Sequence, residues 1–109
     1  MSRHRLVPRD PSIEEVAVGY DWPLGEFFVQ VFEYPTEDGD ERLLFAKSFP
    51  AVAASSHLPN VHVWGCIGAA SKFAHIPPNL YAELQRDRGD PELCNRTVRW
   101  QYTATWNNH

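Results

Sequence analysis

The sequence lacks most of the features that identify secreted, disulfide-rich or membrane proteins. Its 109 residues include only two cysteines, Cys66 and Cys94, and neither belongs to a C-x-x-C pair. A disulfide framework is therefore excluded; two buried free thiols are the simpler expectation, and a single bridge stays open. No apolar run reaches membrane-spanning length, and the first residues lead into no signal-peptide core. We expect a cytoplasmic protein that does not enter a membrane.

Motifs of catalysis and cofactor binding are also missing. There is no G-x-S-x-G elbow, and Gly65 and Gly68 are not followed by the Lys-Ser/Thr of a phosphate loop. The acidic stretch at 37–41 lacks the ligand ladder of a calcium loop and suits a solvated hairpin tip. The sequence therefore predicts no cofactor and no catalytic residue.

Basic residues are fewer than acidic ones, whereas aromatic residues are frequent. The formal net charge is −4, so a nucleic-acid binder, which usually carries a basic stripe, is disfavoured. Aromatic residues make up 13% of the chain and include four tryptophans. Such side chains stabilise a small core and also dominate binding hot spots.

Alternation of apolar residues predicts strands over 13–20, 26–34 and 42–49, which would form an antiparallel meander. The strand at 26–34 is apolar on both faces, which is typical of a covered strand or of one that offers a face to a partner. Asp38-Gly39 is a favoured hairpin pair, and the turn at 21–25 contains Pro23 and Gly25.

The second half predicts helices and a last strand. Residues 61–74 fit either a helix or a short strand, because their apolar spacing suits both and two glycines weaken a helix. A helix is expected from Pro77 to Gly89, followed by a capped turn at Asp90. Clean alternation over 96–106 predicts a half-buried C-terminal strand.

These elements predict an α+β fold. It consists of a small antiparallel sheet, made of the three-strand meander plus the C-terminal strand, packed against one or two helices. Residues 1–12 are polar and contain Pro8 and Pro11, so they predict a flexible N-terminal arm. Residues 13–109 would then form a single α+β domain.

The leading functional hypothesis is a small non-enzymatic binding or regulatory protein that acts through protein–protein contacts, such as an inhibitor of a larger bacterial machine. Small size, acidic charge and dense aromatics favour it. Trp22 stands at a turn tip, where it either caps the core or contacts a partner. The predicted partner-binding residues are Tyr20, Asp21, Trp22, Leu24, Glu37, Asp38, Asp40, Arg99 and Trp100.

Three alternatives stay open. His62 and Cys66 stand four apart and, with His75, could form a metal site or a Cys/His enzyme, although no second ligand pair completes the set. Aromatics and arginines on the last strand could stack single-stranded nucleic acid. That same strand, 96–106, could instead pair with a second copy to make a homodimer.

Three stretches of the chain form a pattern: Gly19-Tyr20-Asp21-x-Pro23-Leu24-x-x-Phe27-Phe28, Ile76-Pro77-Pro78-x-Leu80-x-x-x-Leu84-x-x-Asp87, and Asn95-x-x-x-Arg99-Trp100. With this pattern the chain resembles a group of short bacterial proteins with no established activity. The resemblance covers most of residues 19–100, while 51–66 fits it poorly. The resemblance implies a bacterial or phage-linked cytosolic protein and assigns no functional residue.

Overall fold

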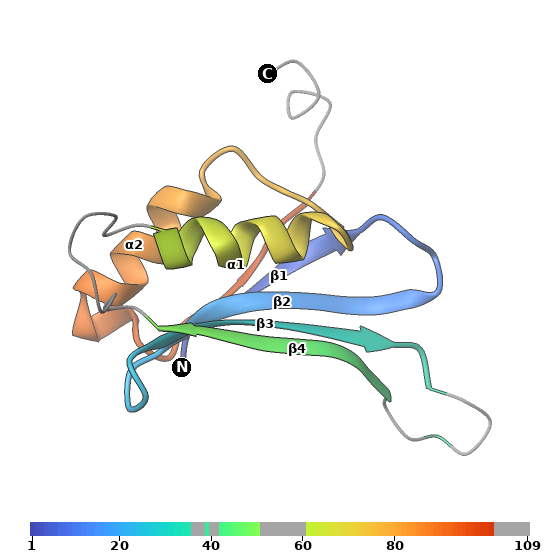
Figure 1. Cartoon of the computed structure of the whole chain (residues 1–109), viewed down its shortest axis with the longest axis horizontal. Coiled ribbons are helices and arrows are strands. Elements are labelled where there is room, and N and C mark those ends of the chain that lie inside the picture. The colour runs from blue at the N-terminus through green and yellow to red at the C-terminus, as the bar shows by residue number, and fades with distance from the viewer. Residues whose placement is uncertain (36–38, 40–41, 51–60, 102–109) are drawn as a thin grey trace.

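The computed structural model describes residues 1–35, 39, 42–50 and 61–101. In this part of the chain, six strands form a mostly antiparallel sheet, and two helices lie on one of its faces (Figure 1). The α+β class predicted from the sequence is therefore confirmed. Among the helices of the described residues, none lies over the opposite face of the sheet, and we call it the open face.

The strands are β1 (Arg3–Pro8), β2 (Ile13–Asp21), β3 (Glu26–Glu33), β4 (Arg42–Pro50), β5 (Ala74–His75) and β6 (Thr97–Arg99). The helices are α1 (Val61–Ser71) and α2 (Leu80–Gly89), followed by the 3-10 turn η1 (Pro91–Leu93). The spatial order of the strands is β4-β3-β2-β1-β5, and β6 also pairs with β1. Strand β4 therefore lies at one edge of the sheet and β6 at the other.

The predicted meander is confirmed as β2-β3-β4, with antiparallel pairing throughout. Val18 lies opposite Val29, so the apolar sets of both strands share the face under the helices. Gly25, in the turn between β2 and β3, has a φ of 64°, which a glycine adopts without strain. The predicted Asp38-Gly39 hairpin falls largely outside the described residues.

The prediction of a flexible arm over residues 1–12 is wrong. Strand β1 lies inside the sheet, between β2 on one side and β5 and β6 on the other. The segment looks polar because two of its three inward residues, Ser2 and His4, are polar and only Leu6 is apolar. A domain that starts at residue 13 therefore leaves out a strand of its own sheet.

The C-terminal strand is shorter than predicted and differently placed. Within the described residues, only Thr97–Arg99 form a strand, and β6 runs parallel to β1 rather than antiparallel to a meander strand. Residues 102–106 of the predicted strand lie outside the described residues. Trp100 still donates its backbone N–H to the Arg5 carbonyl oxygen at 3.0 Å, which continues the pairing by one residue.

Residues 61–71 form helix α1, which settles the choice left open by the sequence. Gly65 lies where the helix approaches β4: a Cβ atom there would stand 3.1 Å from the Phe49 ring. A glycine that weakens the isolated helix thus allows close packing on the sheet. Helix α2 begins at Leu80, three residues after Pro77, and Asp90 caps η1 by accepting the N–H of Glu92 at 2.9 Å.

The core lies between the helices and the sheet. Its buried members come from every strand of the meander, from β1 and from both helices: Leu6, Val16, Val18, Phe27, Val29, Val31, Phe49, Val63, Ile67, Leu80 and Leu84. Trp64 of α1 stacks on Tyr81 of α2, with ring centroids 4.5 Å apart, and so joins the two helices at the surface. The open face and the two sheet edges remain for contacts with other molecules.

Candidate functional site

Tyr20 and the turn at 21–25 that follows it hold four of the predicted partner-binding residues, and the structure separates them. Tyr20 is buried and meets Trp22 edge-on, with ring centroids 5.6 Å apart. The Trp22 indole N–H donates to the Asp87 carbonyl oxygen at 2.9 Å, so this ring caps the end of α2. Asp21 accepts the N–H of Leu24 at 3.4 Å, and Leu24 itself is 68% exposed. Leu24 is the apolar contact that this turn offers to solvent.

The other predicted contact residues lie at the β6 edge or outside the described part of the chain. Trp100 is half-buried, and its indole N–H donates to Nδ1 of His4 at 3.0 Å. Arg99 is exposed and lies beside Arg5 in the β1–β6 ladder. Glu37, Asp38 and Asp40 are not among the described residues. The binding role of all these residues stays a prediction.

A buried polar cluster centred on Asp87 was not predicted. Asp87 accepts a hydrogen bond from His4 Nε2 at 2.6 Å and another from Arg96 Nε at 2.7 Å, and both Asp87 and His4 are fully buried. Arg96 also pairs with Glu83 at 2.6 Å. The sequence did contain a signal: Asp87 follows Leu80 and Leu84 at positions i+7 and i+3, on the buried stripe of α2.

The protonation of this cluster follows from its geometry. An indole N–H can only donate, so Nδ1 of His4 carries no proton and Nε2–H donates to Asp87. Burial alone would raise the pKa of Asp87, but the hydrogen bonds from His4, Ser2 and Arg96 hold that pKa below its usual value. The ionised Asp87 therefore accepts hydrogen bonds from His4 and Arg96 inside the fold.

The His4–Asp87 pair has the appearance of a general-base dyad, but it cannot serve a solute. Both ring nitrogens of His4 are occupied, and neither side chain reaches solvent. A general base must lie within hydrogen-bond reach of the proton that it removes. The cluster instead joins β1, α2 and the β6 edge, and it therefore stabilises the fold.

The structure does not bring Cys66, His62 and His75 together into the metal site or Cys/His active site considered above. Cys66 faces the core, and its thiol donates to the Phe28 carbonyl oxygen at 3.3 Å. Burial raises the pKa of this thiol to about 12, so the nucleophilic thiolate is disfavoured. His62 lies on α1 and His75 on β5. Among the described residues, no group of three or more His, Cys, Asp or Glu side chains could hold a metal ion.

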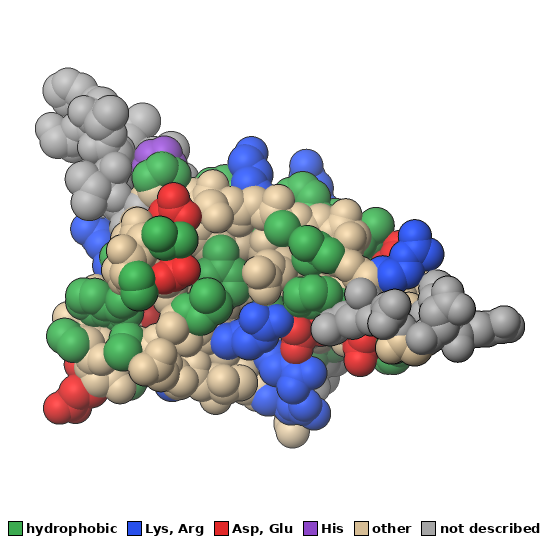
Figure 2. All heavy atoms as spheres, turned by 90° about the horizontal axis from the view of Figure 1, so that it is seen from below, with side chains coloured by type: hydrophobic (Ala, Val, Ile, Leu, Met, Phe, Trp, Pro, Cys, Tyr) green, Lys and Arg blue, Asp and Glu red, His purple; other side chains and the backbone are tan. Residues whose placement is uncertain are grey.

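Figure 2 shows the open face of the sheet, where a cluster of arginine and lysine side chains lies beside acidic ones and hydrophobic side chains are scattered across the face. Phe28 is only 7% exposed here, and the Arg3 guanidinium lies 5.8 Å from the centre of the Phe32 ring. Single-stranded nucleic acid needs bare rings for stacking, and these two rings are largely covered.

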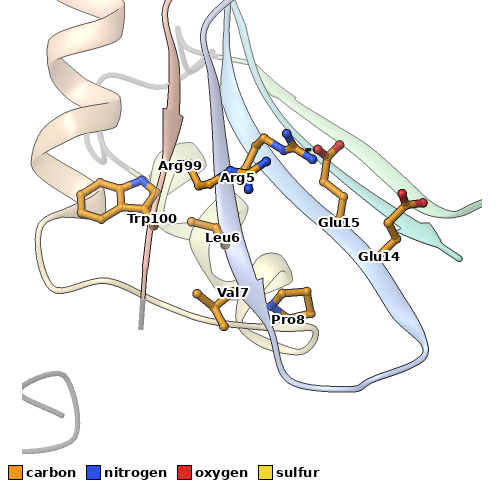
Figure 3. A pocket seen from close by; sticks show the side chains of 8 residues that line it. All are labelled: Arg5, Leu6, Val7, Pro8, Glu14, Glu15, Arg99 and Trp100. Carbon is orange, nitrogen blue, oxygen red and sulfur yellow. Dashed lines mark ion pairs between the residues drawn. The ribbon is translucent and has the colours of Figure 1, made fainter. Parts of the chain in front are cut away.

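In the part of the chain that the structure describes, two surface features could receive another molecule. One is the outer edge of β4, where Leu43 is 54% and Leu44 is 48% exposed. The other is a pocket of about 220 Å³ at the opposite edge of the sheet, shown in Figure 3. It is lined by Arg5, Leu6, Val7, Pro8, Glu14, Glu15, Arg99 and Trp100.

Comparison with protein-family models, curated proteins and solved structures finds no significant match for this chain. The likeness to short bacterial proteins therefore stays a prediction. Within the described residues, no helix is both long and apolar enough to cross a membrane.

Proposed function

We propose that this chain is a small binding protein, and that the outer edge of β4 takes up an extended acidic segment of a partner protein. The observation that carries the proposal is the state of this edge. Among the described residues, β4 pairs with β3 alone, and most of its nine residues are exposed. Unpaired backbone groups along such an edge are a template for another strand.

The dimensions of the edge suit strand addition. Nine residues at a strand rise of about 3.4 Å span roughly 30 Å. From Phe45 to Pro50 the pairing with β3 is regular, and a bulge at Leu44 interrupts it at the other end. A bound segment would gain backbone hydrogen bonds along the regular part and apolar contacts with Leu43 and Leu44.

The charge of the edge selects the partner chemistry. The charged side chains of β4 are Arg42 and Lys47, and both are basic. Arg42 stands 3.9 Å from Glu33, a distant pairing, and Lys47 lies over the Phe49 ring at 5.2 Å from its centre. Opposite charges across paired strands stabilise the pair, so carboxylates that alternate with apolar side chains fit this edge best.

The regulatory role expected from the sequence stays part of this proposal. A small protein that occupies a strand-forming segment of a larger protein would compete with the segment's own partner. Leu24, on the turn at 21–25, is also exposed, but it lies at the end of the meander away from Leu43 and Leu44 and outside the proposed contact. Cys66 and Cys94 are both free thiols, which agrees with the cytoplasm as the expected compartment.

The test uses three synthetic decapeptides in which valine alternates with glutamate, serine or lysine. We expect the glutamate peptide to bind most tightly and the lysine peptide least, measured by fluorescence polarisation at low ionic strength. Hydrogen exchange of the β4 amides is expected to slow when the glutamate peptide is bound, because outward N–H groups become paired.

Leu44→Glu is the decisive variant, and Leu24→Glu is its matched control. Leu44→Glu adds a negative charge at the edge and should weaken binding of the glutamate peptide about fivefold or more, while Leu24→Glu should leave it unchanged. Equal loss in both variants, or exchange protection that avoids β4, would contradict the proposal. If β4 amides become protected with rising protein concentration and no peptide, the occupant is a second copy and the partner proposal is wrong.

A further inference from the structure

The pocket at the β6 edge has charges of both signs in an ordered row. Arg99 and Arg5 are direct neighbours in the β1–β6 ladder, Arg5 pairs with Glu15, and Glu14 is the residue before Glu15 in the chain. Figure 3 shows these four side chains in that order, with the Arg5–Glu15 ion pair in the middle. One end of the row is positive, and the other end is negative.

A bulge in β2 makes this row possible. The pairing of β2 with β3 shifts between Ile13 and Glu15, so the strict alternation of side chains is broken at Glu14. Two consecutive glutamates then line the same pocket. In a regular strand they would point to opposite faces.

The two ends of the row have charges without a partner. Glu15 is shared between Arg5 and Arg3, whose Nη2 lies 2.5 Å from the carboxylate. Within the described residues, neither Arg99 nor Glu14 makes an ion pair, and both are exposed. Arg99 and Arg5 also stand side by side with like charge, which is unfavourable across paired strands. An anion at Arg99 and a cation at Glu14 would relieve both situations.

The remaining walls are apolar. Leu6, Val7 and Pro8 of β1 and Trp100 at the end of β6 line them, and the Leu6 side chain itself faces the core. At about 220 Å³, the pocket is smaller than the roughly 300–1,000 Å³ of sites for drug-sized ligands. It therefore suits a short carbon chain rather than a nucleotide.

We propose that this pocket binds a small zwitterion whose carboxylate lies at Arg99 and Arg5 and whose ammonium lies at Glu14, with a few methylene groups between them. The guanidinium groups provide charge-assisted hydrogen bonds to the carboxylate, and the glutamate accepts those of the ammonium. This site is separate from the β4 edge and does not depend on the function proposed there.

The test uses ω-amino carboxylic acids of increasing chain length as a ruler, titrated against the full chain and followed by NMR chemical shifts. We expect the affinity to pass through a maximum at one chain length. At that length the zwitterion should bind about fivefold more tightly than the alkyl carboxylate without the amine, and likewise than the alkylamine without the carboxylate. An affinity that rises steadily with length, or equal binding of the analogues, would overturn the proposal.

Two variants separate the ends of the ligand, and both change exposed residues. Arg99→Gln should remove the advantage of the zwitterion over the alkylamine, and Glu14→Gln should remove its advantage over the alkyl carboxylate. Arg42→Gln removes an exposed charge at the opposite edge of the sheet. It is the matched control and should leave the affinity for the zwitterion unchanged. Zwitterion binding that survives both pocket variants, or that falls equally in the control, refutes the assignment.

Discussion

Asp87 explains why the tryptophans of this chain are difficult to interpret from sequence. Trp22 donates to its backbone carbonyl oxygen, and Trp100 donates to the histidine that bonds its carboxylate. A buried indole N–H needs an acceptor, and here that acceptor is an internal cluster. Truncation of either tryptophan would therefore change stability together with any binding. Leu43 and Leu44, which are exposed at the β4 edge, are better positions for testing contacts with a partner.

Cys66 offers a direct test of the Cys/His alternative at the scale of one residue. With a thiol pKa of about 12 and no exposure, about 10⁻⁴ of this group is a thiolate at pH 8. We expect iodoacetamide to label the half-buried Cys94 in the native protein and to leave Cys66 unlabelled, with both labelled in denaturant. Peptide mass spectrometry measures the two rates. Native labelling of Cys66 as fast as that of Cys94 would restore the nucleophile hypothesis.

At the scale of elements, the sequence predicted the strands whose apolar and polar residues alternate, and it missed strand β1, whose residues do not follow that pattern. The apolar period of β2 and β3 identified both strands, because their helix-facing positions are uniformly apolar. Strand β1 was missed because its inward positions include Ser2 and His4, whose polar groups are satisfied by partners far along the chain. Its pairing with β6 joins residues more than 90 positions apart, which local patterns do not report.

For the candidate sites too, the sequence locates some residues but not the spatial arrangement that brings them together. The exposed leucines of β4 could be located from sequence as part of a strand, but its position at the sheet edge depends on strand order. The charge row of the pocket combines residues from β1, β2 and β6, and it needs the bulge at Glu14. Neither strand order nor a bulge is encoded in a short pattern of hydrophobic residues.

Gly19 is the position that fixes the docking of β1 on β2. A Cβ atom at Gly19 would collide with the Ser2 carbonyl oxygen and stand 2.9 Å from the Phe28 ring. We expect Gly19→Ala to lower the free energy of unfolding by about 1–3 kcal/mol or more, because packed neighbours must shift. Urea denaturation measures this change.

The control for that substitution is Gly68→Ala in α1. A Cβ atom there meets nothing within 4 Å, so alanine should raise the free energy of unfolding by up to about 1 kcal/mol through helix propensity. If Gly19→Ala is as stable as the original chain, or if both substitutions change stability in the same direction, the close approach of β1 to β2 is not what the structure indicates.

At the scale of the whole molecule, the distribution of charge matters more than its sum. The chain carries a net charge of −4, yet the carboxylates of Glu83 and Asp87 are paired with the arginines Arg86 and Arg96. Hydrogen bonds from Arg96 and Arg86 lower the pKa of Glu83, and those from His4, Ser2 and Arg96 outweigh burial and lower the pKa of Asp87. Two carboxylates that hold the N-terminal strand, α2 and the β6 edge together must therefore stay ionised.

The pH dependence of stability follows from these two pKa values. Because both are lower in the folded chain than the ordinary values of 3.8 for Asp and 4.5 for Glu, the unfolded chain binds protons first as the pH falls. The stabilisation is complete above about pH 5 and is lost as the pH falls through the folded pKa values. We expect these two carboxylates to contribute a decline in the free energy of unfolding that begins below about pH 5, measured by urea denaturation between pH 7 and pH 2.5. Asp87→Asn should make that decline shallower, whereas Ile67→Val, which weakens the core without removing a charge, should lower the curve and keep its slope. An Asp87→Asn variant with the original acid slope would show that the buried carboxylate does not control acid stability.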